Sequence, residues 1–115
     1  MNNNFSIKKL VCLIFLFLGI YCSAFEINDA YESQLNALID LYDQLDGSNW
    51  FPCNWNHSLK VDPFCQWCGI ECGGINQTEI VKISLPNNNL KGMIPNSIGD
   101  LDKMINIDLS TNSIT

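Results

Sequence analysis

A repeat of 24 residues in the C-terminal part of the chain constrains its fold more than any other feature. Ile83–Leu90 reads ISLPNNNL and Ile107–Ile114 reads IDLSTNSI, so both fit the pattern LxLxxNxL with aliphatic residues at the L positions. Every matched position recurs 24 residues later, and Ile80 and Met104 form one more apolar pair with the same spacing. A fixed period of this length predicts stacked coils, because one coil cannot bury its aliphatic side chains alone.

Each coil is expected to consist of a short strand followed by an asparagine turn. Ile83 points into the coil while Ser84 points out, because side chains alternate along a strand. Asn88 then enters the interior, where its amide can pair with free backbone groups of the turn. Asn112 repeats this role, so the asparagines are expected to form a ladder between coils. Pro95 is expected on the convex side, where no sheet requires an amide hydrogen from it.

The outward-facing positions of the two strands and their turns are the candidate ligand surface. These positions are Lys82, Ser84, Asn87, Asn106, Asp108 and Ser110. Specific protein–protein interfaces bury about 1,600 Å². Two coils offer less area than this, so in a longer relative these residues are expected to contribute only the rim of a binding surface.

Residues 1–24 have the layout of a secretory signal peptide. A polar start with two lysines is followed by the apolar run Leu10–Ile20 and by a small-residue site that ends at Ala24. We therefore expect cleavage after Ala24 and export from the cell. The alternative is an uncleaved anchor helix. Its uncharged stretch is only about 16 residues long, whereas a helix that spans a bilayer needs about 20.

The charge of the chain beyond Ala24 excludes one class of partner. This part carries twelve acidic residues and four lysines, and the whole chain contains no arginine. The resulting net charge of −8 repels phosphate backbones and anionic lipid. We therefore expect no nucleic-acid partner, and we also expect no cofactor.

An amphipathic helix is expected over residues 29–46. Asp29 and Glu32 have the spacing at which each side chain satisfies the other's free amide at a helix start. Gly47 is expected to close the helix in the left-handed conformation. The apolar stripe at helical period consists of Leu35, Leu38, Ile39, Tyr42 and Leu45.

Residues 48–74 differ in kind, because they show no sustained period. They hold all three tryptophans, which we expect to pack the core rather than to stack on sugars. An even number of cysteines in a short exported chain predicts disulfides, but spacing does not choose among the three possible pairings. A zinc site that also uses His57 is the alternative, and export argues against it because secreted thiols oxidise. The four cysteines concerned are Cys53, Cys65, Cys68 and Cys72.

Glycosylation is expected at two positions, and catalysis at none. Asn56 and Asn76 each begin an N-x-S/T sequence, the acceptor site for N-glycans in secreted proteins. His57 is the only histidine, and no nucleophile–base pair lies near it in the sequence. Paired carboxylates such as Asp40 and Asp43 are expected to be solvated surface.

Three segments in series resemble the start of plant-type extracellular leucine-rich-repeat proteins, a family that includes receptor-like-kinase ectodomains and polygalacturonase-inhibitor-like proteins. Ala37–Tyr42 followed by Gly47–Trp50 is similar to the helix of the family's N-terminal cap and to its exit. Cys65–Cys72 is similar to the cap signature CxWxGVxC, with Ile for Val. Leu85–Pro95 is similar to the repeat motif LSxNxLxGxIP, with Pro for the usual Ser.

The resemblance implies an α/β fold in which a cap precedes a solenoid. Residues 25–79 are expected to form a helical, disulfide-bonded N-terminal cap. Residues 80–115 are expected to form two leucine-rich repeats with short parallel strands, the second of them incomplete. The cap shields the hydrophobic end of the first coil from water.

The resemblance also implies one disulfide. In the family the two cysteines of the cap signature pair, which here means Cys65 with Cys72. A bond between Cys53 and Cys68 is then the simplest proposal for the other two. The residues for which we expect structural roles are Trp67, Gly69, Asn88, Asn112 and Pro95.

The function implied is a non-enzymatic recognition module, secreted or on the outer face of the plasma membrane, that binds a protein, peptide or glycan ligand. A secreted inhibitor of a wall-degrading hydrolase and the ectodomain of a receptor kinase share this scaffold. Because the second coil stops at Thr115, we expect a fragment of a larger protein. The alternative is a mini-protein that dimerises through its open end. Membrane attachment is expected only through a further C-terminal segment or an uncleaved signal.

Overall fold

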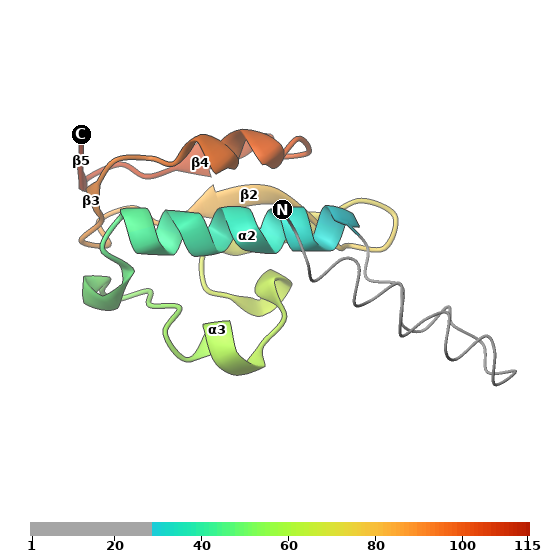
Figure 1. The fold of residues 1–115 in the computed structure, drawn as a ribbon, viewed down its shortest axis with the longest axis horizontal. Helices are drawn as coiled ribbons and strands as arrows, with labels where there is room; N and C mark the ends of the chain where they lie inside the picture. Colours follow the sequence, from blue (N-terminus) through green and yellow to red (C-terminus); the bar gives the residue numbers. More distant parts are fainter. Residues whose placement is uncertain (1–28) are drawn as a thin grey trace, which may run out of the picture.

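The computed structural model describes residues 29–115, except for the side chain of Lys60. The predicted signal peptide and its cleavage after Ala24 lie outside the described residues and stay predictions. Figure 1 shows α2 lying along the sheet, with the loop that carries α3 on one side and β4 on the other. In chain order the elements are α2 (Asp29–Gln44), η2 (Gly47–Asn49), α3 (Ser58–Val61), η3 (Phe64–Gln66), β1 (Ile70–Gly73), β2 (Glu79–Ser84), β3 (Lys91–Gly92), η4 (Asn96–Asp100), β4 (Asn106–Asp108) and β5 (Ser113–Ile114).

The helix α2 buries one face, which is centred slightly away from the predicted stripe. Leu35 and Ile39 of that stripe are only half-buried, because the helix turns Ala37 and Leu41 towards the core instead. Each fully buried leucine contributes about 2 kcal/mol to the stability of the fold, because its apolar surface is removed from water. The buried residues of α2 are Gln34, Ala37, Leu38, Leu41 and Tyr42, and Leu45 follows just beyond its end.

Gln34 is a polar residue on this buried face, and it connects the cap helix to the first coil. Its side-chain Oε1 accepts a hydrogen bond from the backbone N–H of Ile80 at 2.7 Å, and its Nε2 donates to the carbonyl of Thr78 at 3.4 Å. The side chain therefore satisfies the backbone groups where β2 begins, which explains how an amide is tolerated in the core. This role of Gln34 was not predicted from the sequence.

The end of α2 differs by one residue from the prediction for Gly47. The left-handed conformation belongs to Asp46, with φ 62° and ψ 47°, and Asn49 steadies it by donating to both Asp46 carboxylate oxygens at 3.1 Å. Gly47 is required for space instead, because a Cβ there would lie 2.2 Å from Cδ2 of Tyr42. The prediction that Gly47 closes the helix in the left-handed region is therefore wrong.

The sheet confirms the parallel stacking that the repeat predicts, and it adds a strand from the cap. β2 and β4 are parallel, and Ile83 lies opposite Ile107. β1 pairs with the other edge of β2 in the antiparallel direction, with a bulge between Glu71 and Cys72. A second, two-stranded parallel sheet joins β3 to β5. Neither β1 nor this second sheet was predicted, because each is too short to show a period.

The three tryptophans pack the cap core. Trp50, Trp55 and Trp67 are at most 3 % exposed, and their rings form a chain in which Trp55 contacts both others at centroid distances of 4.8 and 5.2 Å. Each indole N–H donates to a buried or part-buried carbonyl, namely that of Leu45, Cys68 or Asp62 respectively. Rings that are buried and paired in this way fill a core and are closed to stacking by a ligand.

Two disulfides close the cap in the expected pairing. Cys53 bonds to Cys68 and Cys65 bonds to Cys72, with Cα–Cα distances of 5.9 and 5.6 Å. All four cysteines of residues 29–115 are therefore oxidised. The alternative of a zinc site is wrong, because a zinc ligand must be a free thiolate.

The two coils differ in burial although their sequences match. Ile83 is fully buried, whereas its repeat equivalent Ile107 is 41 % exposed. The reason is that β2 lies between two strands, while β4 has one neighbour in the sheet. A coil of this kind needs a layer on both sides to bury its aliphatic side chains.

Candidate functional site

The six predicted ligand-surface residues lie on adjacent strands and on the turns that follow them. Lys82 lies directly opposite Asn106, and Ser84 lies opposite Asp108. At the turn, the backbone N–H of Asn87 donates to the carbonyl of Ser110 at 2.9 Å, so these two residues also adjoin. All six side chains are exposed or half-buried. We call Lys82, Ser84, Asn106 and Asp108 the strand face.

Glu71, which was not predicted from the sequence, also belongs to the strand face and extends it onto the cap strand β1. Glu71 of β1 is the pairing partner of Lys82, so Glu71, Lys82 and Asn106 form one row across three strands. Glu71 is exposed and lies between two half-buried neighbours, Ile70 and Cys72. That alternation covers three residues only, which is too short to identify a strand from sequence.

Asp108 is held as a carboxylate by its neighbour in the turn. Its Oδ1 accepts hydrogen bonds from the hydroxyl of Ser110 at 2.6 Å and from the backbone N–H of Ser110 at 3.0 Å. The side-chain bond, then the backbone bond and then the charge of Lys82 lower the pKa of Asp108 below its ordinary value. The strand face therefore presents a fixed negative charge diagonal to a positive one.

Replacing Ser110 by alanine is expected to raise the pKa of Asp108 part of the way towards the ordinary Asp value of about 3.9. Because folding favours the charged form, the stability that this group contributes is present above the ordinary pKa and is lost as the pH falls through the lowered one. NMR titration of the Asp108 carboxyl carbon measures the change. Ser48→Ala, at an exposed serine of the cap, is the control. An unchanged titration in Ser110→Ala would contradict this assignment.

The side chain of the second turn asparagine, Asn112, forms hydrogen bonds with the backbone of the preceding coil. Oδ1 of Asn112 accepts from the backbone N–H groups of Asn88 and Leu90, both at 2.9 Å, and its Nδ2 donates to the carbonyl of Leu85 at 2.8 Å. Each of these partners belongs to the preceding coil. The ladder therefore runs from an asparagine side chain to the backbone of the coil before it.

The cap supplies the partner that the first asparagine needs. Asn88 is 1 % exposed, and its Oδ1 accepts from the backbone N–H of Cys53 at 2.7 Å, while its Nδ2 donates to the carbonyl of Cys53 at 2.7 Å. The backbone at Cys53 is itself tied to Cys68 by a disulfide. This segment of the cap therefore takes the place of a preceding coil.

Within residues 29–115, no group of three or more His, Cys, Asp or Glu side chains converges to hold a metal ion. No helix in the same range is both long and apolar enough to cross a membrane.

Comparison with known proteins gives similar sequences but no match to a family model. A probable leucine-rich-repeat receptor-like protein kinase of Arabidopsis thaliana is 36% identical over 114 residues, which cover 97% of this chain and 11% of the relative. Phytosulfokine receptor 1 of the same plant is 28% identical over 90% of this chain and 10% of its own length. The chain thus spans about a tenth of the length of these curated relatives.

Solved structures share the fold. A leucine-rich-repeat protein of Bacteroides eggerthii superposes with a TM-score of 0.60 at 25% identity, over 71% of this chain and 13% of that chain. The complex PEPR1-AtPEP1 superposes with a TM-score of 0.55 at 22% identity, over 72% of this chain and 12% of that chain.

Proposed function

The chain carries a leucine-rich-repeat region of the type found in the ectodomains of plant receptor-like kinases, and from this premise we propose that it is a non-enzymatic recognition module. It acts outside the cell, as a secreted protein or at the cell surface, and its strand face binds a protein, peptide or glycan ligand. The relatives' names support this role, since one is a receptor and a protein of the same fold was solved as PEPR1 with AtPEP1.

The observation that carries the proposal is the register of the strand face. Polar side chains from β1, β2 and β4 stand in rows across the sheet, with Lys82 between Glu71 and Asn106. A peptide laid across these strands meets a carboxylate, an ammonium and an amide in one row. The sheet backbone that carries these groups is already ordered, so less conformational freedom is lost when the ligand binds.

Selection from a displayed library of random twelve-residue peptides tests the strand face. Peptides selected on the oxidised chain are expected to bind the Lys82→Ala/Asp108→Ala variant at least about tenfold more weakly, a loss of about 1.4 kcal/mol. The control is Asp102→Ala/Lys103→Ala, which removes the same two charges from exposed positions outside the strand face. Equal binding to both variants, or inhibition of a polygalacturonase without any peptide binding, would contradict the proposal.

N-glycans at Asn56 and Asn76 belong to the same proposal. Both side chains are exposed, as attachment requires. Intact-mass measurement before and after enzymatic deglycosylation checks each site against its Asn→Gln variant.

A further inference from the structure

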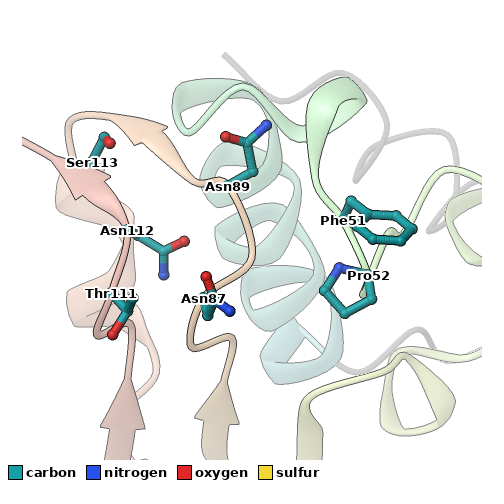
Figure 2. A pocket seen from close by; sticks show the side chains of 7 residues that line it. All are labelled: Phe51, Pro52, Asn87, Asn89, Thr111, Asn112 and Ser113. Carbon is teal, nitrogen blue, oxygen red and sulfur yellow. The ribbon is translucent and has the colours of Figure 1, made fainter.

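A second surface lies where the asparagine turns meet the cap, beyond the ends of the strands. It is an open pocket of about 670 Å³. Figure 2 shows Phe51 and Pro52 of the cap on one side, Asn87 and Asn89 of the first turn in the middle, and Thr111 and Ser113 of the second turn on the other side.

The polar part of this pocket is built by the repeat. Thr111 and Ser113 occupy the positions 24 residues after Asn87 and Asn89. The two turns therefore present polar side chains at equivalent positions, which we call rungs. Neighbouring strands of a sheet lie about 4.8 Å apart. A ligand made of units of similar length, each with its own hydroxyl groups, fits rungs at this spacing.

The polar side chains of the two turns have donors and acceptors that are not used within the described residues. Within residues 29–115, the side chains of Asn87, Thr111 and Ser113 make no hydrogen bond, and Asn89 uses only its Nδ2, which donates to the carbonyl of Asn49 at 2.9 Å. In contrast, the side chain of Asn112 is occupied by hydrogen bonds to the preceding coil and to the carbonyls of Leu109 and Ser110 in its own coil. The rim therefore offers amide and hydroxyl groups that both donate and accept.

One aromatic ring is left outside the core beside these rungs. Phe51 is 77% exposed, although the three tryptophans around it in the sequence are buried. Its backbone N–H donates to the carbonyl of Asn88 at 3.2 Å, which fixes the segment against the first turn. The ring is thus positioned by its backbone and free on its surface.

The pocket is also neutral. None of the seven residues that line it carries a charge, in a chain with a net charge of −6. We propose that this pocket binds a neutral oligosaccharide, with the C–H face of one pyranose ring on Phe51 and its hydroxyls bonded to Asn87, Asn89 and Thr111. An aromatic face beside neutral groups that donate and accept hydrogen bonds suits the C–H faces and hydroxyls of a sugar and offers no charge to an ionic ligand. This proposal does not depend on a ligand at the strand face.

Titration with defined oligosaccharides tests the pocket. The probes are cellohexaose and mannohexaose, which are neutral, and hexagalacturonate, which is acidic; binding to the oxidised chain is followed by calorimetry and saturation-transfer NMR. At least one neutral probe is expected to bind at millimolar concentration or below. Phe51→Ala should weaken it about tenfold or more, as truncation of an aromatic anchor does, and Phe51→Trp should restore it.

The controls separate this site from the strand face. The Lys82→Ala/Asp108→Ala variant should bind the neutral probe as well as the unchanged chain does. Val61→Ala, at an exposed apolar residue of the cap outside the pocket, should also have no effect. The proposal is overturned if no neutral probe binds, or if hexagalacturonate binds as tightly as the neutral probes do. It is also overturned if Phe51→Ala leaves the binding of the sugars unchanged, whether or not selected peptides lose affinity for this variant.

Discussion

Replacing Gly69 by alanine is expected to destabilise the protein by about 2–5 kcal/mol. Gly69 has φ +81°, and a Cβ there would lie 2.4 Å from the carbonyl oxygen of Ser84. A left-handed conformation costs an alanine about 1–2 kcal/mol, and forcing an atom into a packed site adds about 1–3 kcal/mol. The neighbour cannot give way, because it is backbone and because the N–H of Ser84 donates to the carbonyl of Gly69 at 2.7 Å.

Thermal unfolding of the oxidised chain measures this effect, with Gly99→Ala as the matched control. A Cβ at Gly99 meets nothing within 4 Å, so that variant should change the stability by less than about 0.5 kcal/mol. For a domain of this size, a loss of 2 kcal/mol or more corresponds to a fall in Tm of roughly 8 °C or more. Similar unfolding temperatures for Gly69→Ala and Gly99→Ala would contradict the prediction that the close approach of β2 requires a glycine at position 69.

Replacing Asn88 by alanine is expected to cost about 3 kcal/mol and to loosen the cap from the first coil. Both side-chain bonds to Cys53 disappear, which leaves a backbone N–H and a carbonyl of this half-buried residue without their partners. Each such orphaned group costs about 1–3 kcal/mol. The neighbouring bond from Phe51 N–H to the carbonyl of Asn88 uses backbone atoms and should survive.

Denaturant unfolding and amide hydrogen exchange distinguish this effect from general destabilisation. The Cys53 amide should exchange much faster in Asn88→Ala, whereas the Ile80 amide, which is bound by Gln34, should be affected less. Asn96→Ala, at an exposed residue in η4, serves as the control and should leave both amides protected. Uniformly faster exchange at Cys53 and Ile80 would argue against a local link at Asn88.

The repetitive half of the fold was predictable from sequence. Positions 24 residues apart have the same environment in successive coils, so the pattern alone paired Ile83 with Ile107 and aligned the two asparagines. Periodicity carries this information because each coil contacts its neighbour with the same side chains. The burial of the two isoleucines differs nonetheless, since burial depends on how many strands flank each one.

The cap was predictable only in outline. The helix, the buried tryptophans and, through the family resemblance, the pairing of Cys65 with Cys72 agree with the structure. The antiparallel strand β1 and the left-handed Asp46 were not foreseen, and neither were the bonds of Gln34 to the start of β2. Each of these features occurs once in the chain, so no repeat marks it.

Sequence by itself therefore determined which residues share a role: the aliphatic anchors, the turn asparagines and the outward-facing strand positions. Only the tertiary structure decided which residues meet, as when Asn88 binds Cys53 across 35 positions of the chain or when Phe51 and Asn87 come to line one pocket. The physical reason is that a side chain's preference for strand, turn or core depends on its near neighbours in the chain. A hydrogen bond between distant segments depends instead on where packing places two backbones, within a few tenths of an ångström.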